Sequence, residues 1–256
     1  MEIIIYLFLF VLGLSLGSFA NVCIWRIPQE SLSIVKPRSF CPLCRRTIPW
    51  YYNIPVFSFI LLRGRCAYCK GSIRIRYPVI EIISGLLVLL IYFRFGYSYE
   101  TFIYTVFSIL LLIGSVIDID FQILPAEITY FLVILGLALS PVNTFLGKSI
   151  IISIRGALFG GGLILLFRWL GTIVFKKEAM GMGDVKLMLG IGAFIGIYGV
   201  FWSVFLGSCL GSVFGIGSRI FKKTGKYDYI PFGPFLSMGA IIYLLKTDLL
   251  IRIFFR

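Results

Sequence analysis

The stretch Gly181-Met182-Gly183-Asp184-Val185-Lys186 opens an apolar segment and places an aspartate between two glycines and a long hydrophobic run. Its surroundings are almost entirely apolar, because 59% of the 256 residues are hydrophobic and only 14% are charged. A soluble domain carries roughly 25% charged residues. The composition therefore predicts an all-α polytopic membrane protein, in which a carboxylate at this position is costly to bury and indicates function.

Eight apolar stretches are long enough to be considered as membrane-spanning helices, since a bilayer core of about 30 Å requires about 20 residues. They lie at roughly 3–25, 78–97, 101–119, 128–147, 151–175, 185–199, 201–220 and 232–253. The sequence thus predicts about eight transmembrane helices. It also predicts three regions: a first transmembrane helix (1–25), a long loop (26–77) and a transmembrane core (78–256).

The basic residues predict the orientation, because loops rich in Lys and Arg remain in the cytoplasm. Ten of the 24 Lys and Arg residues lie between Arg26 and Arg76. This loop is therefore expected inside and both termini outside. The net charge of +13 follows from this topology and favours contact with anionic lipid headgroups over nucleic-acid binding.

Four cysteines of the long loop form two Cys-x-x-Cys pairs, Cys41 with Cys44 and Cys66 with Cys69. Two such turns can direct four thiolates at one tetrahedral zinc ion, and a site closed in this way is structural. The alternative, a pair of disulfides or a redox pair, conflicts with a reducing cytoplasmic location. The pattern favours zinc, whose binding would supply folding energy to a loop poor in apolar residues.

Proton chemistry must rely on the carboxylates, since the chain contains no histidine. Five acids are expected at or near membrane borders: Glu81, Asp118, Asp120, Glu127 and Asp184. In the predicted topology Asp118 and Asp184 lie at the same, cytoplasmic, membrane face. Because successive helical residues turn by about 100°, Asp118 and Asp120 point nearly opposite ways, and the deeper Asp118 is the better partner for Asp184.

Two carboxylates held together can share a proton, so that one activates a water while the other donates to a scissile carbonyl. The pair predicts aspartyl peptide hydrolysis, and Gly181 and Gly183 would allow a substrate backbone to approach Asp184 closely. From position alone, helix capping explains the same aspartates equally well. Two interpretations are also open for Glu81. It could hydrogen-bond to the loop or lie at the lipid headgroups, or it could contact a basic leader or a methyl-transfer site.

Several segments in this order resemble the bacterial type IV prepilin leader peptidases. They are Gly181-Met182-Gly183-Asp184, Asp118 with Leu124-Pro125 downstream, the paired Cys-x-x-Cys turns, Gly17-Ser18-Phe19-Ala20-Asn21-Val22 followed by Trp25-Arg26-Ile27-Pro28, Arg76-Tyr77-Pro78-Val79-Ile80-Glu81, and Ile230-Pro231-Phe232-Gly233-Pro234-Phe235. The family usually has Leu-Pro-Asp where this chain has Leu124-Pro125-Ala126-Glu127. That departure leaves Asp118 unaffected.

The resemblance implies an inner-membrane aspartyl endopeptidase that removes basic leaders from prepilins or pseudopilins after a glycine at the cytoplasmic face. It implies Asp118 and Asp184 as the catalytic pair and Cys41, Cys44, Cys66 and Cys69 as zinc ligands. It also implies N-methylation of the new N-terminus with S-adenosylmethionine, associated with the 26–77 loop. The alternatives are a peptidase without methyltransferase activity and a metal-regulated, proton-coupled transporter, whose acids are expected nearer the membrane midplane.

Overall fold

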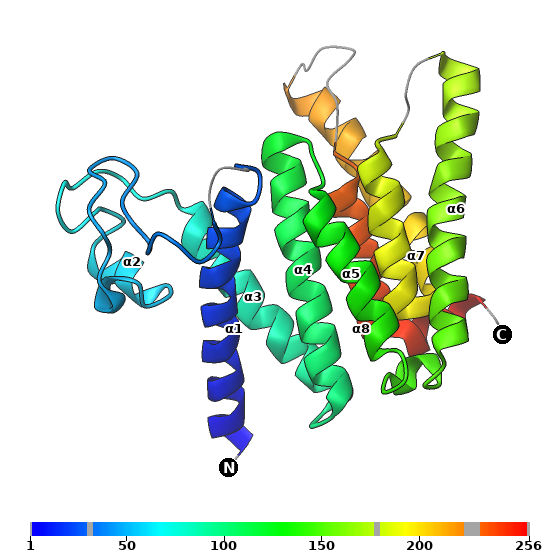
Figure 1. The fold of residues 1–256 in the computed structure, drawn as a ribbon, viewed down its shortest axis with the longest axis horizontal. Helices are drawn as coiled ribbons and strands as arrows, with labels where there is room; N and C mark the ends of the chain where they lie inside the picture. Colours follow the sequence, from blue (N-terminus) through cyan, green and yellow to red (C-terminus); the bar gives the residue numbers. More distant parts are fainter. Residues whose placement is uncertain (1, 30–32, 177–179, 223–230, 255–256) are drawn as a thin grey trace. The chain divides into compact units, whose positions relative to one another are not determined.

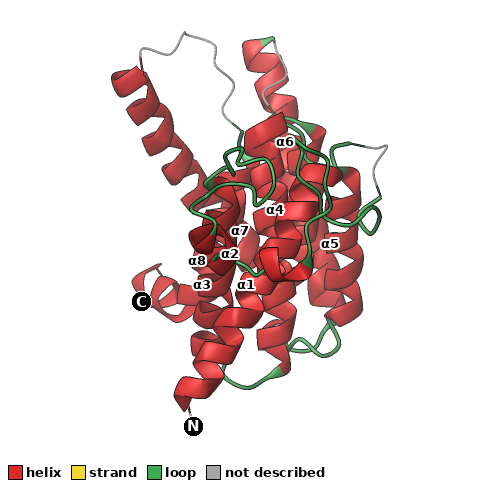
Figure 2. Cartoon of the chain, turned by 90° about the vertical axis from the view of Figure 1, so that its left-hand side faces the viewer, coloured by secondary structure: helices red, strands yellow, loops and turns green. Residues whose placement is uncertain are grey.

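The computed structural model describes residues 2–29, 33–176, 180–222 and 231–254, and its fold is helical (Figure 1). Within these ranges there are no strands (Figure 2), and the loops contain two isolated β-bridges. The chain divides into two compact units, Met1–Thr101 and Phe102–Arg256. The all-helical fold class is therefore confirmed, and each unit is described by itself.

The first unit pairs α1 (Glu2–Arg26) with α3 (Arg76–Phe95) and holds the short helices η1 (Trp50–Tyr52) and α2 (Phe57–Leu61) in the intervening loop. Small residues bring the two long helices into close contact. A Cβ added at Gly13 would lie 2.7 Å from the Gly85 Cα, and one at Gly17 would lie 2.6 Å from the Glu81 Cα. Close backbone approach of this kind is how helices associate in a lipid environment, where apolar burial alone gives no preference.

The second unit contains α4 (Tyr99–Phe121, its first residues belonging to the other unit), α5 (Ala126–Leu139), η2 (Thr144–Leu146), α6 (Ile150–Phe175), α7 (Met182–Lys222) and α8 (Gly233–Phe254). Glycines again set the packing distance. A Cβ at Gly156 of α6 would overlap the Gly192 carbonyl of α7 and lie 2.7 Å from the Gly196 Cα. The core of this unit is therefore built on close contact between α6 and the first half of α7.

Helix α7 reverses direction at Gly196, where φ is 67° and ψ is −172°. This conformation is accessible essentially to glycine alone. The break leaves backbone carbonyls without helical partners, and side chains satisfy them: Ser153 Oγ donates to the Ala193 carbonyl at 2.6 Å, and Asn143 Nδ2 donates to the Phe194 carbonyl at 3.2 Å. A broken helix is tolerated at membrane depth when neighbouring groups supply such bonds.

Both halves of α7 consequently reach one end of the second unit, where its yellow and orange halves lie side by side in Figure 1. At this end Gly183 packs on Leu124, and the Phe214 and Phe235 rings lie 5.6 Å apart. The end of α4 and the start of α5 meet at the same end (Figure 1). The reversal therefore brings the start of α7 and the start of α8 beside the end of α4.

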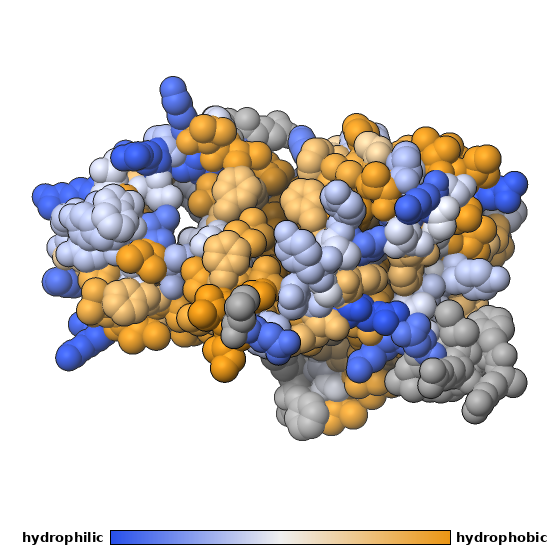
Figure 3. All heavy atoms as spheres, turned by 90° about the horizontal axis from the view of Figure 1, so that it is seen from below, coloured by the Kyte–Doolittle hydropathy of each residue, from blue (hydrophilic) through white to orange (hydrophobic). Residues whose placement is uncertain are grey.

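Five of the described helices are long and apolar enough to cross a membrane, namely Glu2–Arg26, Arg76–Phe95, Tyr99–Phe121, Ile150–Val174 and Met182–Ser218. Large apolar side chains are exposed on them, such as Phe8 at 65% and Trp169 at 61%. Figure 3 shows apolar side chains over large parts of one face, interrupted by hydrophilic ones. These helices indicate a multi-pass membrane protein.

Two predicted helix boundaries were wrong. The apolar stretch 128–147 forms a helix only to Leu139, because Pro141 has no N–H to continue the ladder. The stretches 185–199 and 201–220 are parts of one run that breaks at Gly196, inside the first of them. Glycine is frequent in this chain, and nothing local marks which one adopts a positive φ.

Candidate active site and metal centre

Asp118 and Asp184 line one pocket of about 250 Å³ in the second unit, together with Gln122, Ile123, Leu124, Gly181 and Gly183. Asp118 comes from the last turn of α4 and Asp184 from the first turn of α7. Asp118 is 4% exposed and Asp184 is 3% exposed. The structure therefore brings the two predicted catalytic residues into one site and buries both.

Asp118 is held by the first residue of α8. The Gly233 backbone N–H donates to Asp118 Oδ2 at 3.2 Å. A Cβ on Gly233 would lie 2.7 Å from the same oxygen, so no larger residue fits without displacing the carboxylate. Gly233 belongs to the motif Ile230–Phe235, whose first residue lies outside the described residues. The sequence does not mark it as a site residue, because its contact is made across 115 positions of the chain.

The two glycines beside Asp184 have different surroundings. A Cβ at Gly181 would meet nothing closer than 3.8 Å, whereas one at Gly183 would lie 2.8 Å from the Leu124 Cβ. Gly181 thus leaves open space next to the carboxylate, as expected for an approaching backbone. Gly183 is needed for close packing on Leu124, a requirement that has no signal in the sequence.

Leu124 holds the pocket together from the α4–α5 connection. Leu124 contacts Gly183, and a Cβ added at Gly233 would lie 3.2 Å from the Leu124 Cδ1. Pro125 follows it and precedes the first residue of α5. The Leu124-Pro125 break therefore places one side chain between the starts of α7 and α8, beside both aspartates.

The other border acids lie elsewhere. Asp120 and Glu127 are exposed and do not line the pocket. Glu81 lies in the first unit, where its Oε2 accepts a hydrogen bond from the Val56 N–H at 2.8 Å, which is the loop contact that one reading predicted. Capping accounts for part of the Asp184 environment, since the Gly181 N–H is directed at its carboxylate, but capping does not explain two buried acids in one pocket.

The four predicted metal ligands also converge. The Sγ atoms of Cys41, Cys44, Cys66 and Cys69 all lie within 4.8 Å of one another, and those of Cys41 and Cys69 are 3.9 Å apart. None of the four is in a disulfide. A tetrahedral zinc ion with Zn–S bonds of about 2.3 Å needs sulfurs about 3.8 Å apart. The cluster could therefore hold a metal ion, and its donors fit zinc.

The two cysteine turns have the same backbone structure. Cys41 N donates to the Arg46 carbonyl at 2.9 Å, and Cys66 N donates to the Gly71 carbonyl at 2.8 Å. Each turn closes with a residue of positive φ after its second cysteine, Arg45 at 56° and Lys70 at 57°. The Cys-x-x-Cys spacing alone does not show that the two turns share this backbone structure.

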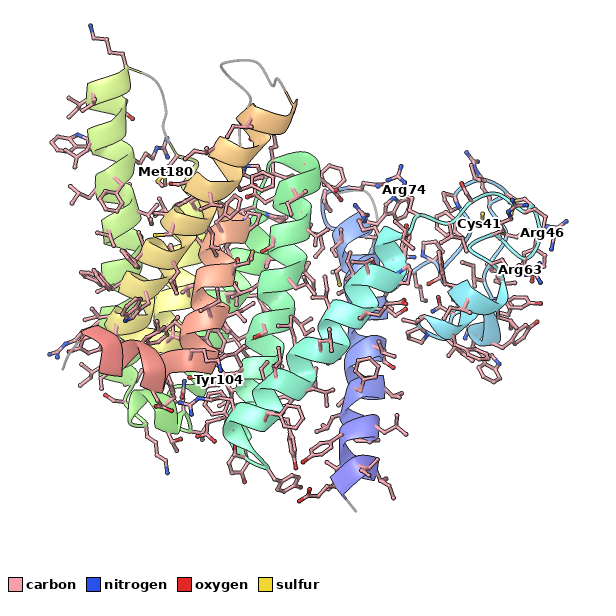
Figure 4. All side chains as sticks on the ribbon, turned by 180° about the vertical axis from the view of Figure 1, so that it is seen from behind. Cys41, Arg46, Arg63, Arg74, Tyr104 and Met180 are labelled. Atoms are coloured by element: carbon pink, nitrogen blue, oxygen red, sulfur yellow. The ribbon has the colours of Figure 1, made fainter. Side chains whose placement is uncertain are left out.

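Contacts within the loop join the two cysteine turns and shift the pKa values of their thiols. The Arg46 guanidinium of the first turn stacks over the Tyr68 ring of the second, 5.3 Å from its centroid. Backbone N–H groups of Cys69 and Tyr68 lower the pKa of the Cys66 thiol to about 7, whereas burial and the neighbouring thiols Cys66, Cys44 and Cys41 raise the pKa of the Cys69 thiol to about 11. Figure 4 shows Cys41 and Arg46 on this loop, with Arg63 close by.

Replacing Gly233 with Ala is expected to reduce activity at the pocket by tenfold or more. The new Cβ would press on Asp118 Oδ2, and overpacking of this kind costs about 1–3 kcal/mol. The measurement is the rate of peptide cleavage by the purified variant. Gly162→Ala in α6 is the matched control, because a Cβ there meets nothing within 4 Å. Equal cleavage rates for the two variants would show that Gly233 does not position Asp118.

Two family models match the chain over most of its length. The bacterial peptidase A24 N-terminal domain matches residues 11–95, and the type IV leader peptidase family matches residues 105–216. No solved structure matches the chain.

Named relatives agree with these matches. The prepilin leader peptidase/N-methyltransferase of Myxococcus xanthus is 40% identical over 210 residues, which cover 82% of this chain and 62% of that protein. The type 4 prepilin-like proteins leader peptide-processing enzyme of Escherichia coli is 34% identical over 91% of both chains. The prepilin leader peptidase/N-methyltransferase of Neisseria gonorrhoeae is 33% identical over 93% of this chain and 89% of its own. With its two family domains in the same order as its two compact units, the chain belongs to the type IV leader peptidase family.

Proposed function

We propose that this chain removes the basic leader of type IV prepilins or pseudopilins after a glycine, using Asp118 and Asp184, and methylates the new N-terminus. Family membership makes the chain a peptidase of the prepilin-processing type with an N-methyltransferase activity. The observation that carries the assignment of the catalytic pair is the burial of both aspartates in one pocket.

In the proposed cleavage, one carboxylate takes a proton from a water as the water attacks the scissile carbonyl. The other, protonated, donates to the carbonyl oxygen, and the pair then protonates the leaving amine. The Gly233 N–H on Asp118 Oδ2 keeps that carboxylate in place during these transfers. The open space at Gly181 is where the substrate backbone would lie next to Asp184.

We propose that the chain crosses the bacterial inner membrane eight times. The five long apolar helices, the shorter α5, the reversal of α7 and the apolar α8 support this number. The basic 26–77 loop would be cytoplasmic and both termini outside. The end of α4 and the start of α7, which line the pocket, would then face the cytoplasm together with the start of α8, and a prepilin leader resides on that side.

The cofactors follow from the two activities. Zinc held by the four thiolates would be structural, because the donor set leaves no open coordination position. S-adenosylmethionine, when bound, supplies the methyl group. The proposed partners are prepilins or pseudopilins as substrates and membrane lipids around the helices, without a role for nucleic acid.

The experiment uses the full chain in detergent with a prepilin and S-adenosylmethionine, followed by mass spectrometry of the product. The expected product lacks its leader and carries one methyl group on the new N-terminal amine. An uncleaved prepilin would contradict the proposal. A cleaved but unmethylated product would support the peptidase activity and contradict the methyltransferase activity.

A further inference from the structure

The first unit contains a cavity of about 590 Å³ between α1, the cysteine loop and the start of α3. Its volume lies within the range of roughly 300–1,000 Å³ that is usual for small-molecule sites. The pocket of the two aspartates is less than half this size and belongs to the other unit. The larger cavity is not explained by peptide cleavage.

One side-chain acceptor that lines this cavity is buried without a hydrogen-bond partner in the described part of the chain. Asn21 lines it, is 4% exposed, and its Nδ2 donates to the Tyr77 carbonyl at 3.1 Å. Its Oδ1 is buried without a hydrogen-bond partner among the described residues. A buried acceptor left unpaired costs about 1–3 kcal/mol, which a ligand with an N–H donor would recover.

The cavity presents charged groups of both signs. Glu81 is the one acid among the described residues that line it, and it is 8% exposed. Three basic side chains also line it: Arg26, Arg74 and Arg76. Its carboxylate is oriented by the Val56 N–H. The rings of Trp25 and Tyr52 line the same cavity, and aromatic faces attract ligand cations.

We infer that this cavity binds S-adenosylmethionine, with Asn21 as an acceptor and Glu81 facing the cationic part of the ligand. The inference rests on the proposed methyltransferase activity and locates it. The ligand matches this lining: it has a flat adenine for the aromatic rings, N–H donors for Asn21 Oδ1, a sulfonium for Glu81 and a carboxylate for the arginines. S-adenosylhomocysteine lacks the methyl group and with it the sulfonium charge, so the carboxylate favours the methyl donor over its product.

The test measures equilibrium binding of S-adenosylmethionine and S-adenosylhomocysteine to the purified zinc-loaded chain in detergent, by calorimetry. Glu81→Gln keeps an oxygen for the Val56 N–H but removes the charge, and it is expected to weaken S-adenosylmethionine binding about tenfold or more while leaving S-adenosylhomocysteine nearly unchanged. Asn21→Leu is expected to weaken both. Glu127→Gln, an exposed acid on α5, is the matched control and should bind like the parent chain.

Leader cleavage by the same preparations reports whether the variants are folded, and it should remain at the parental rate in both. If Glu81→Gln and Asn21→Leu bind S-adenosylmethionine as tightly as the parent chain, the proposed location of the ligand is wrong. The methyltransferase activity itself would not be contradicted by that result. Competition for the cavity by a peptide with a free N-terminal amine, dependent on Glu81, would reassign it to the methyl acceptor and equally overturn the inference. Absence of binding by the parent chain, together with an unmethylated product, would reject the activity itself.

Discussion

Asp184→Asn and Asp118→Asn are each expected to lower the rate of leader cleavage by about 10²–10⁴-fold, the contribution of a positioned acid or base. An amide can neither accept the proton of the attacking water nor donate a proton to the carbonyl as a carboxylic acid does. Because both side chains are buried in one pocket, the loss of either should stop the reaction. The measurement is single-turnover cleavage of a prepilin by purified protein.

Asp120→Asn is the matched control for these variants. It lies two positions from Asp118 on the same helix but is exposed and outside the pocket. Its rate should remain near that of the parent chain. The double variant Asp118→Asn/Asp184→Asn should be no slower than either single one, because groups that act as a unit are not additive. Substantial cleavage by either single variant would show that the two acids do not form a pair.

Replacing any one of Cys41, Cys44, Cys66 or Cys69 with Ser is expected to abolish zinc binding and unfold the loop. Structural zinc supplies an apparent binding free energy of about 10–16 kcal/mol in small zinc domains, and this loop contains few buried apolar side chains of its own. Metal analysis of protein purified under reducing conditions should fall from one zinc per chain to almost none. Limited proteolysis should then cut within residues 26–77, and methyl transfer should be lost.

Cys209→Ser is the control for the cysteine variants, since Cys209 is an exposed free thiol on α7 in the other unit. Its zinc content and protease resistance should match those of the parent chain. A parent chain that contains no zinc but four disulfide-bonded cysteines would contradict the metal site. Full zinc content in one of the four ligand variants would show that the site has fewer thiolate ligands.

The sequence was sufficient where the signal is local and periodic. The 100° turn per helical residue lets only one of Asp118 and Asp120 face Asp184, and its greater depth in the apolar run selects Asp118. The structure places Asp118 in the pocket and Asp120 at the surface. Likewise, two Cys-x-x-Cys turns imply a four-thiolate cluster, and the four sulfurs do converge. Long apolar runs give the helices of both units, apart from their exact ends.

What the sequence could not predict depends on contacts between distant segments. The Gly233 N–H reaches Asp118 only after α7 has turned back at Gly196, and neither event has a local signature among the 27 glycines of the chain. The same holds for Leu124, whose role arises from the glycines that pack on it from α7 and α8. The orphaned acceptor of Asn21 inside the first unit is equally invisible in a pattern of apolar residues.

An experimental structure of the chain with a peptide inhibitor that carries a hydroxyl in place of the scissile carbonyl tests the central claim most directly. The quantity to measure is the distance from that hydroxyl to the carboxylate oxygens of Asp118 and Asp184. The proposed pair predicts that both lie within hydrogen-bond reach, about 2.6–3.2 Å, or one bridging water away. An inhibitor bound with either carboxylate beyond the reach of one water would contradict it.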